Sequence, residues 1–237
     1  DSSSLRSSVV SHAKTLGYEP QSARAPKAVV DVTLFDSVKA TGTIPAGTVF
    51  TTSVNNVDYN FVTTAELTSA NTGNSIPFLD VPIFEGTFIT TQYTVDSTDV
   101  DQRFLLTDNR ADTTTLTVTV QTSATDTTST IYTKTTDISQ ITSTSANYFL
   151  QEVENGLFEV YFGDGILGKL LSDGNIVILT YVVTNRTDAN TATIFTNAAA
   201  IDTVLDVQVS TVEPASGGAI PESVDSIKFN APLDFAA

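Results

Sequence analysis

The sequence predicts a mainly-β fold made of two β-domains, one inserted in the other, with a short helix near each end of the chain. Three observations predict it. Apolar and polar residues alternate in many short runs, as half-buried strands require. Glycine and proline stand between these runs at turn positions. Threonine is abundant, which suits the exposed faces of strands.

The alternating runs extend over most of the chain. They occupy residues 30–34, 59–63, 115–120 and 205–209. The sequence Ile-Pro-Ala-Gly-Thr at 44–48 predicts a turn that leads into a strand at 49–50. The Thr/Ser-rich stretch 122–136 is expected to form a mobile hairpin or loop, because alternating patterns resume on both sides of it.

The segment 157–183 carries the clearest strand and turn signals. Three residues alternate to one face and are expected in the core: Phe158, Val160 and Phe162. The Gly-Asp-Gly sequence at 163–165 predicts a tight turn with positive φ at one of its glycines. The apolar run 176–183 predicts the next strand. The segment is therefore expected to have a structural role and to contain no catalytic group.

A short helix is predicted at the N-terminus. Its apolar stripe recurs at helical spacing and is expected to pack against another element: Leu5, Val9, Ala13 and Leu16. Ser2, Ser3 or Ser4 is expected to cap its start. Gly17 is placed to end the helix, and Pro20 prevents it from continuing.

A second short helix is predicted near the C-terminus. Ser216-Gly217-Gly218 ends the β pattern, and Pro221 suits the first position of a helix, with Glu222 favourable in its first turn. Val224, Ile227 and Lys228 are then expected to form one or two turns before Pro232.

The order of these patterns predicts the domain organisation. Alternation resumes after residue 190, and sequential strands are usually neighbours. We expect four parts: an N-terminal helix and linker (1–28), an outer β-domain (29–95 plus 191–213), an inserted β-domain (96–190) and the start of a C-terminal helical or linker segment (214–237).

Composition excludes several classes of function. The chain has 237 residues, 41% of them hydrophobic, and a formal net charge of −16. The acidic balance argues against a nucleic-acid binder and against an anionic membrane surface. Cysteine is absent, which excludes disulfides and thiol chemistry. We expect no membrane span and no secretory signal, and a start at Asp1 with no methionine in the chain suggests a fragment.

Candidate catalytic residues lack motif partners. His12 is the single histidine, and no Gly-x-Ser-x-Gly sequence accompanies it, so a surface or interface role is expected. Asp164 between two glycines is interpreted as a turn residue. Gly163-Asp164-Gly165 with Gly168 fits a Gly-x-Gly-x-x-Gly string, but no helix of useful length follows, so a dinucleotide site is rejected.

One acidic cluster could hold a metal. Asp96, Asp99 and Asp101 offer the oxygen ligands that calcium prefers, but the EF-hand pattern is not met. A solvated loop is therefore the expectation. We predict no catalytic, cofactor-binding or metal-binding residues, and no cofactor.

Seven motifs occur in a characteristic order along nearly the whole chain. They are Leu5-Arg6-Ser7-Ser8-Val9-Val10, Gly17-Tyr18-Glu19-Pro20, Ile44-Pro45-Ala46-Gly47-Thr48, Asn60-Phe61-Val62, Tyr161-Phe162-Gly163-Asp164-Gly165 with Gly168, Asp188-Ala189-Asn190, and Gly217-Gly218 with Pro221-Glu222. Together they resemble the middle part of the large baseplate wedge subunit of contractile-tailed (myovirus) bacteriophages, within the baseplate J-like family.

The resemblance implies a structural virion protein with no catalytic residues. Two copies of the family's subunit dimerise in each wedge, and the dimers link into a ring around the tail hub. The implied partners are a second copy of the chain, other baseplate wedge subunits and the sheath-initiating baseplate protein. Nucleic acid, membrane and small-molecule substrates are not expected. The implied location is the tail baseplate of the virion, assembled in the host cytoplasm.

Two other classes of function fit part of the sequence. A secreted adhesin-like β-sandwich, binding calcium through Asp96, Asp99 and Asp101, would also have threonine-rich acidic strands without cysteine. The predicted helix at each end and the lack of tandem repeats count against it. A carbohydrate-active enzyme would need two carboxylates about 5–9.5 Å apart in a cleft, and no motif supports this.

Overall fold

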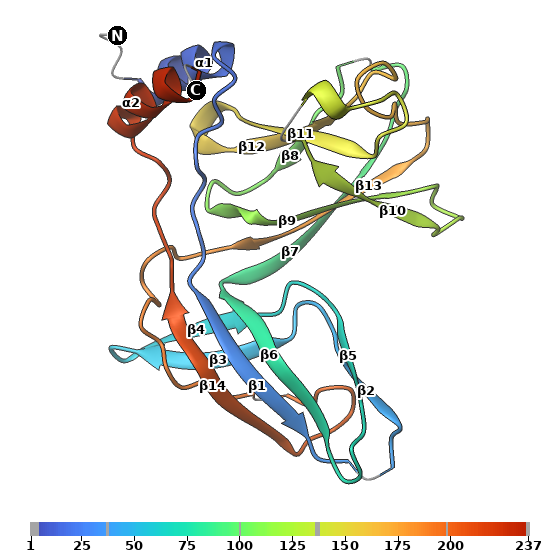
Figure 1. The fold of residues 1–237 in the computed structure, drawn as a ribbon, viewed down its shortest axis with the longest axis vertical. Helices are drawn as coiled ribbons and strands as arrows, with labels where there is room; N and C mark the ends of the chain where they lie inside the picture. Colours follow the sequence, from blue (N-terminus) through green and yellow to red (C-terminus); the bar gives the residue numbers. More distant parts are fainter. Residues whose placement is uncertain (1–4, 37, 100, 136–137, 198, 236–237) are drawn as a thin grey trace. The chain divides into compact units, whose positions relative to one another are not determined.

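The chain forms two compact units, each made of separate chain segments. The computed structural model describes residues 5–36, 38–99, 101–135, 138–197 and 199–235. Unit 1 contains Asp1–Ser22, Ile89–Tyr181 and Pro221–Ala237, and unit 2 contains Ala23–Phe88 and Val182–Ile220. Strands dominate and a helix lies near each end of the chain, so the predicted mainly-β fold is confirmed (Figure 1). That the chain folds as separate domains with the predicted boundaries stays a prediction.

Unit 2 is built on a five-stranded sheet in the order β14-β1-β6-β4-β3. Its strands are β1 (Lys27–Leu34), β3 (Val49–Val54), β4 (Val57–Val62), β6 (Ile76–Glu85) and β14 (Val207–Ser216). A separate two-stranded sheet pairs β2 (Thr41–Ile44) with β5 (Leu67–Ala70). β14 runs antiparallel to β1, with Val209 opposite Val32, so strands from the two ends of the chain pair directly.

One irregular segment, residues 191–196, bonds to both outer strands of this sheet. The Thr191 amide donates to the carbonyl of Ala215 in β14 at 2.8 Å, and the Ala215 amide donates to the Ala192 carbonyl at 2.8 Å. At its other end, Thr196 exchanges two backbone hydrogen bonds with Thr51 in β3. Alternating apolar residues of the strands fill the core beneath, together with side chains of this irregular region such as Phe195.

Unit 1 is built on a seven-stranded sheet in the order β7-β13-β9-β10-β11-β12-β8. Its strands are β7 (Thr87–Thr94), β8 (Phe104–Leu106), β9 (Ala111–Gln121), β10 (Ser129–Lys134), β11 (Asn147–Glu152), β12 (Phe158–Phe162) and β13 (Ile176–Val183), with 3-10 turns η1 (Ile138–Gln140) and η2 (Glu154–Gly156). The two outermost strands meet: Tyr93 in β7 donates its hydroxyl to the Leu105 carbonyl in β8 at 2.6 Å. The sheet is therefore curled.

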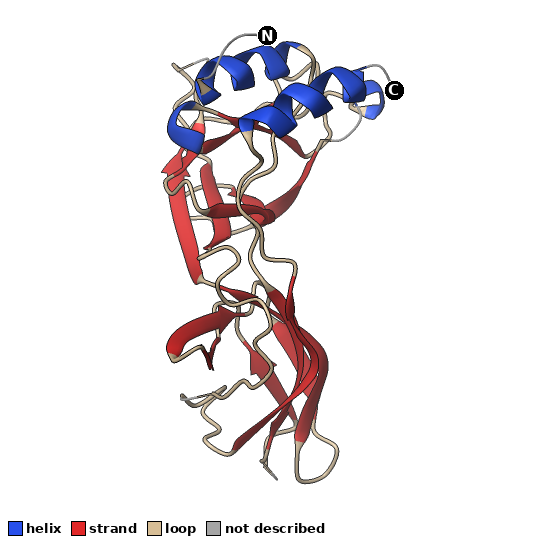
Figure 2. Ribbon diagram, turned by 90° about the vertical axis from the view of Figure 1, so that its left-hand side faces the viewer, coloured by secondary structure: helices blue, strands red, loops and turns tan. Residues whose placement is uncertain are grey.

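The two helices of unit 1 pack against each other. Figure 2 shows α1 (Arg6–Thr15) and α2 (Val224–Phe235) side by side. Their shared core contains Val9, Val10, Ala13, Ile227 and Ala231, with Leu16 packed at its margin. The predicted burial of Leu5, the first residue of the stripe, is wrong. Leu5 is 67% exposed because it precedes the first helical turn. The predicted caps Ser2, Ser3 and Ser4 lie outside the described residues.

The C-terminal helix differs from the prediction at both ends. It begins at Val224 rather than Pro221, and Ser223 caps it by accepting a hydrogen bond from the Ser226 amide at 3.2 Å. It also continues through Pro232 to Phe235. Proline removes one helical hydrogen bond, but the buried contacts of Ile227 and Ala231 with α1 hold the turns on either side. Tertiary packing thus overrides the local signal.

One strand expectation is confirmed and one needs correction. The Thr/Ser-rich stretch 122–136 forms the turn and second strand of a hairpin, since β10 pairs antiparallel with β9 and Ser129 lies opposite Gln121. Tyr132 is its one buried side chain among the described residues. Leu205 is 85% exposed because β14 begins two residues later, at Val207.

The segment around the Gly-Asp-Gly turn largely follows its prediction. Phe158 and Val160 are buried in β12, while Phe162 is half-buried. Gly165 has a φ of +87°, so the predicted positive-φ position is confirmed. No helix among the described residues combines the length and apolar character needed to cross a membrane.

Candidate interaction surface

An ion pair fixes the helix pair of unit 1 to its sheet. Glu152, at the end of β11, is 1% exposed. Arg6, at the start of α1, donates from Nε to Oε1 at 2.6 Å and from Nη2 to Oε2 at 2.8 Å. Arg6 also donates to the carbonyl oxygen of Glu222, just before α2. Because bidentate pairs of this kind are directional, a single guanidinium sets the position of both helices on the sheet.

The side chain of Glu222 gathers a second set of polar contacts around the same helices. Its carboxylate accepts hydrogen bonds from the Tyr18 hydroxyl at 2.9 Å and the Gln21 amide at 3.1 Å. It also accepts from Ser226 Oγ at 2.8 Å and Asn230 Nδ2 at 2.9 Å, both in α2. One carboxylate therefore joins α2 to the chain that follows α1.

These contacts shift two pKa values in opposite directions. Burial alone would raise the pKa of Glu222, but the hydrogen bonds from Asn230, Ser226, Gln21 and Tyr18 outweigh it and lower the pKa below its ordinary value. Burial raises the pKa of Tyr18, and its hydrogen bond to the Glu222 carboxylate raises it further. Tyr18 is thus kept as a neutral donor and Glu222 as a charged acceptor.

His12 lies on a groove between the two helices. The groove has a volume of about 470 Å³ and also contains Leu16, Lys228 and Pro232. Among the hydrogen bonds of the described residues, none joins the His12 ring to a serine or a carboxylate. This position is that of a surface histidine beside an apolar core.

The acidic residues considered for calcium bind their own loop. Asp96 Oδ1 accepts hydrogen bonds from the amide and the hydroxyl of Thr98, at 2.9 and 2.6 Å. Asp99 Oδ1 accepts from the Asp101 amide at 3.2 Å. Over the part of the chain that the structure describes, no three His, Cys, Asp or Glu side chains are grouped to hold a metal ion. The structure therefore does not bring Asp96, Asp99 and Asp101 together as ligands.

Asp164 acts as the turn residue that the sequence predicts. Its Oδ1 accepts hydrogen bonds from the amides of Ile166 at 2.9 Å and Leu167 at 3.0 Å. The bonds from Leu167 and Ile166 lower the pKa of the carboxyl. Asp164 therefore stabilises the loop between β12 and β13 as an anion.

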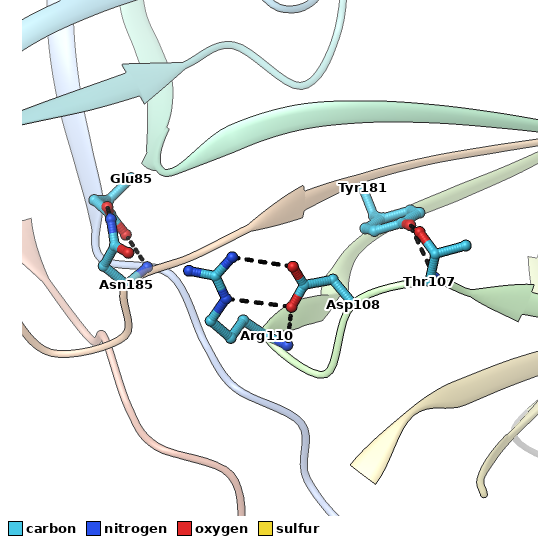
Figure 3. A network of polar contacts seen from close by, with 6 residues as sticks. All are labelled: Glu85, Thr107, Asp108, Arg110, Tyr181 and Asn185. Atoms are coloured by element: carbon cyan, nitrogen blue, oxygen red, sulfur yellow. Dashed lines mark hydrogen bonds and ion pairs between the residues drawn. The ribbon is translucent and has the colours of Figure 1, made fainter. Parts of the chain in front are cut away.

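A buried acid in unit 2 escaped the sequence analysis. Glu85, at the end of β6, is fully buried. Its Oε2 accepts hydrogen bonds from Thr184 Oγ1 at 2.6 Å and the Asn185 backbone amide at 2.9 Å. Its Oε1 accepts from Asn185 Nδ2 at 2.8 Å. Figure 3 shows the contacts between Glu85 and Asn185. The donors lie 99 and 100 residues away in the sequence, so no local pattern could reveal the contact.

Two polar pairs in unit 1 hold the loop between β8 and β9. The Thr107 amide donates to the Tyr181 hydroxyl at 3.2 Å. Arg110 donates from Nε and Nη2 to the two oxygens of Asp108, at 3.2 and 3.0 Å (Figure 3). These contacts fix loop geometry, and no local pattern signals the long-range one.

A curated phage protein is similar to most of this chain. No family model matches the chain. The chain is similar to the baseplate wedge protein gp6 of Enterobacteria phage T4, with 27% identity over 255 aligned residues. The match covers 94% of this chain but 37% of that protein, so the chain spans little more than a third of its curated relative. That relative is, by its name, a protein of the phage baseplate wedge.

Proposed function

We propose that the chain is a structural component of the baseplate wedge of a contractile phage tail. Two copies form a dimer in each wedge, and the dimers link into a ring around the tail hub. The chain also binds other wedge subunits and the sheath-initiating baseplate protein. Assembly takes place in the host cytoplasm, and the functional location is the tail baseplate.

One observation carries this proposal: the similarity to a baseplate wedge protein extends over 94% of the chain. The match therefore includes sequence from both units rather than a single shared motif. The internal contacts are consistent with a scaffold, because two buried glutamates hold structural elements together. Glu152 binds the helix pair through Arg6, and Glu85 binds the chain that follows β13.

We further propose that the chain is not an enzyme and binds no cofactor, nucleic acid, membrane or small-molecule substrate. The net charge of −16 disfavours phosphate backbones and anionic lipids. The candidate residues support this interpretation: Asp164 and Asp96 bond to their own loops, and His12 lies beside an apolar core.

Electron cryo-microscopy of the source particle tests the proposal. We expect density for the chain in a ring around the tail hub, at two copies per wedge. Contacts with neighbouring subunits should bury more than about 1,000 Å². Calorimetry of the purified chain with calcium is the companion measurement, and we expect no saturable binding. A saturable calcium site that is lost in Asp96→Asn and Asp99→Asn, with the chain absent from virions, would favour the secreted adhesin-like β-sandwich.

A further inference from the structure

A surface groove of unit 1 combines an apolar floor with an acidic rim. It has a volume of about 360 Å³ and is lined by residues from the segments 95–99, 102–104 and 162–171. We call its two aromatic lining residues, Phe104 and Phe162, the floor, and Leu170 is a third apolar residue of the lining. Asp96, Asp99 and Asp164 also line it and are exposed, and we call these three the rim. We call this the acidic groove.

Edge-to-face ring contacts hold the floor of the acidic groove. The ring of Phe162 packs edge-to-face against Phe104, with centroids 5.5 Å apart, and against Tyr132, with centroids 5.3 Å apart. Phe104 packs in the same way on Tyr93. Such aromatic contacts are directional, so the floor keeps its shape when the groove is empty and costs little to order on binding.

The β12–β13 loop is held equally firmly and exposes large apolar side chains beside the groove. Asp164 accepts two amide hydrogen bonds from the loop, and the Gly165 amide donates to the Gly168 carbonyl at 3.1 Å. Ile166 is nevertheless 75% exposed, and Leu170 is 61% exposed. Apolar side chains grouped and fixed in solvent are typical of an interaction site.

The charged side chains that line the groove favour a positively charged ligand. Arg103 also lines it, but its guanidinium lies 4.8 Å from the ring centre of Tyr161 and 3.6 Å from Glu159. The hydrogen bonds of Thr98 lower the pKa of Asp96, and those of Leu167 and Ile166 lower the pKa of Asp164, so both carboxylates are charged at neutral pH. A cationic occupant with an apolar stem matches this lining, whereas phosphate and anionic lipid do not.

We propose that the acidic groove binds a basic segment of another protein. An arginine or lysine of that segment would lay its methylene groups on Phe162 and Leu170, the apolar lining residues with exposed surface, as long basic side chains do on apolar surfaces. Its charge would lie among the rim carboxylates, and an adjacent apolar residue would pack on Ile166. This docking proposal rests on the proposed function. It extends that function by assigning one contact with a partner protein to the acidic groove.

Nuclear magnetic resonance titration of the purified chain tests the proposal. The probe is a capped ten-residue peptide with two arginines flanked by leucines, and its counterpart has glutamates in place of the arginines. We expect saturable shifts for residues 95–99, 101–104 and 162–171 with the arginine peptide alone. Asp99→Lys should weaken binding about tenfold by placing a like charge on the rim, and Ile166→Asp should weaken it as well.

Matched variants control for general effects of charge and of surface polarity. Asp126→Lys changes another exposed turn aspartate of unit 1, and Ile194→Asp changes an isoleucine that is 74% exposed in unit 2. Both should bind the arginine peptide like the original chain. Equal binding of the glutamate peptide, shifts spread evenly over the acidic surface, or an unchanged affinity in Asp99→Lys would overturn the proposal.

The titration is separable from the test of the proposed function. If the groove fails to bind the arginine peptide while the chain is seen in the tail baseplate, the docking inference is wrong and the scaffold role remains. If the groove binds as expected while the chain is missing from virions, the baseplate role is wrong and the docking surface remains.

Discussion

Among the described residues, each compact unit buries one glutamate, and the two are stabilised in different ways. Glu85 in unit 2 is met by neutral donors from two adjacent residues, Thr184 and Asn185. Glu152 in unit 1 is met by the charged guanidinium of Arg6, which lies 146 residues away on a helix. The first acid is satisfied by the backbone and side chains of one short stretch. The second depends on a helix staying docked.

The difference separates two structural roles for a buried charge. Three neutral hydrogen bonds can stabilise a carboxylate without a cation, so Glu85 fastens the end of β6 to the chain after β13. An ion pair with one partner at the surface makes sheet and helix interdependent, because losing the partner leaves an uncompensated charge inside. Unit 1 therefore has a helix pair whose docking can be broken by one substitution.

Arg6→Ala should lower the free energy of unfolding more than any other change that tests this difference between the units. It leaves Glu152 buried without its cation, and we expect a loss of about 3–5 kcal/mol in the free energy of unfolding, or detachment of the helix pair. Urea unfolding monitored by circular dichroism gives the free energy. Lys134→Ala is the matched control: it removes a surface pair with Glu19 at 2.6 Å, and about 0.2–1 kcal/mol should be lost. Equal losses in both variants would remove the special role of Arg6.

Replacing one closely packed glycine in each unit should give the next largest loss in the free energy of unfolding. A Cβ on Gly86 in unit 2 would lie 2.2 Å from the Val183 carbonyl oxygen, and a Cβ on Gly163 in unit 1 would lie 2.1 Å from that of Leu167. Either change to alanine should cost about 2–3 kcal/mol through overpacking. Gly174→Ala, which has a φ of +77° and open space around it, should cost about 1 kcal/mol in the same unfolding assay.

Replacing each buried glutamate by glutamine sharpens the contrast directly. In Glu85→Gln the new side chain can keep its oxygen on Thr184 and the Asn185 amide, and a flipped Asn185 side chain can accept its new N–H. We therefore expect a loss below about 1 kcal/mol for Glu85→Gln. Glu152→Gln loses a charge-assisted bidentate pair, so about 2 kcal/mol should be lost. A larger loss for Glu85→Gln in chemical denaturation would reverse the interpretation.

The helix pair of unit 1 should also respond to acid through Glu222. The pKa of Glu222 is lowered in the folded chain, so its contribution is present above its ordinary pKa near 4.5 and is lost as pH falls through the folded value. Thermal unfolding from pH 7 to pH 3 should show a steeper fall for the original chain than for Glu222→Gln. At pH 7 the variant should lose about 1 kcal/mol, since the carboxylate is partly open to solvent. Parallel pH profiles would contradict this.

His12→Ala should have the smallest effect. Its side chain makes no hydrogen bond that links unit 1 together among the described residues, so stability should change by less than about 0.5 kcal/mol. The same unfolding assay at pH 5 and pH 8 measures it. A loss that grows at one pH would show that the imidazole has a structural partner.

Local patterns were sufficient for much of the fold. Alternation located strands such as β9 and β12, because a half-buried strand shows its two faces in sequence, and a continuous apolar run located β13. Capping residues and proline located the helices less well: α2 begins after Pro221 and passes through Pro232. There, contacts with α1 decided the outcome, and these contacts are invisible to a local window.

Most polar contacts of the surface and core could not be predicted from the sequence. The turn role of Asp164 could be predicted because its hydrogen bonds reach two and three residues along the chain. Glu85, Glu152 and the acidic groove depend on residues brought together from distant segments. Strand β10 was expected only as part of a hairpin or loop, since its threonines are exposed and Tyr132 is the one buried side chain along it.

The pairing of β1 with β14 also constrains the order in which the chain can fold during synthesis. Residues 27–34 have no partner on their second edge until residue 216 has been made, and α1 waits still longer for α2. Contacts so distant in sequence make folding slow, because the intervening chain must be closed before they form. During translation, the early strand and the first helix therefore wait with apolar side chains uncovered. Neither unit can be completed until the last fifth of this sequence, which contains β14 and α2, has left the ribosome.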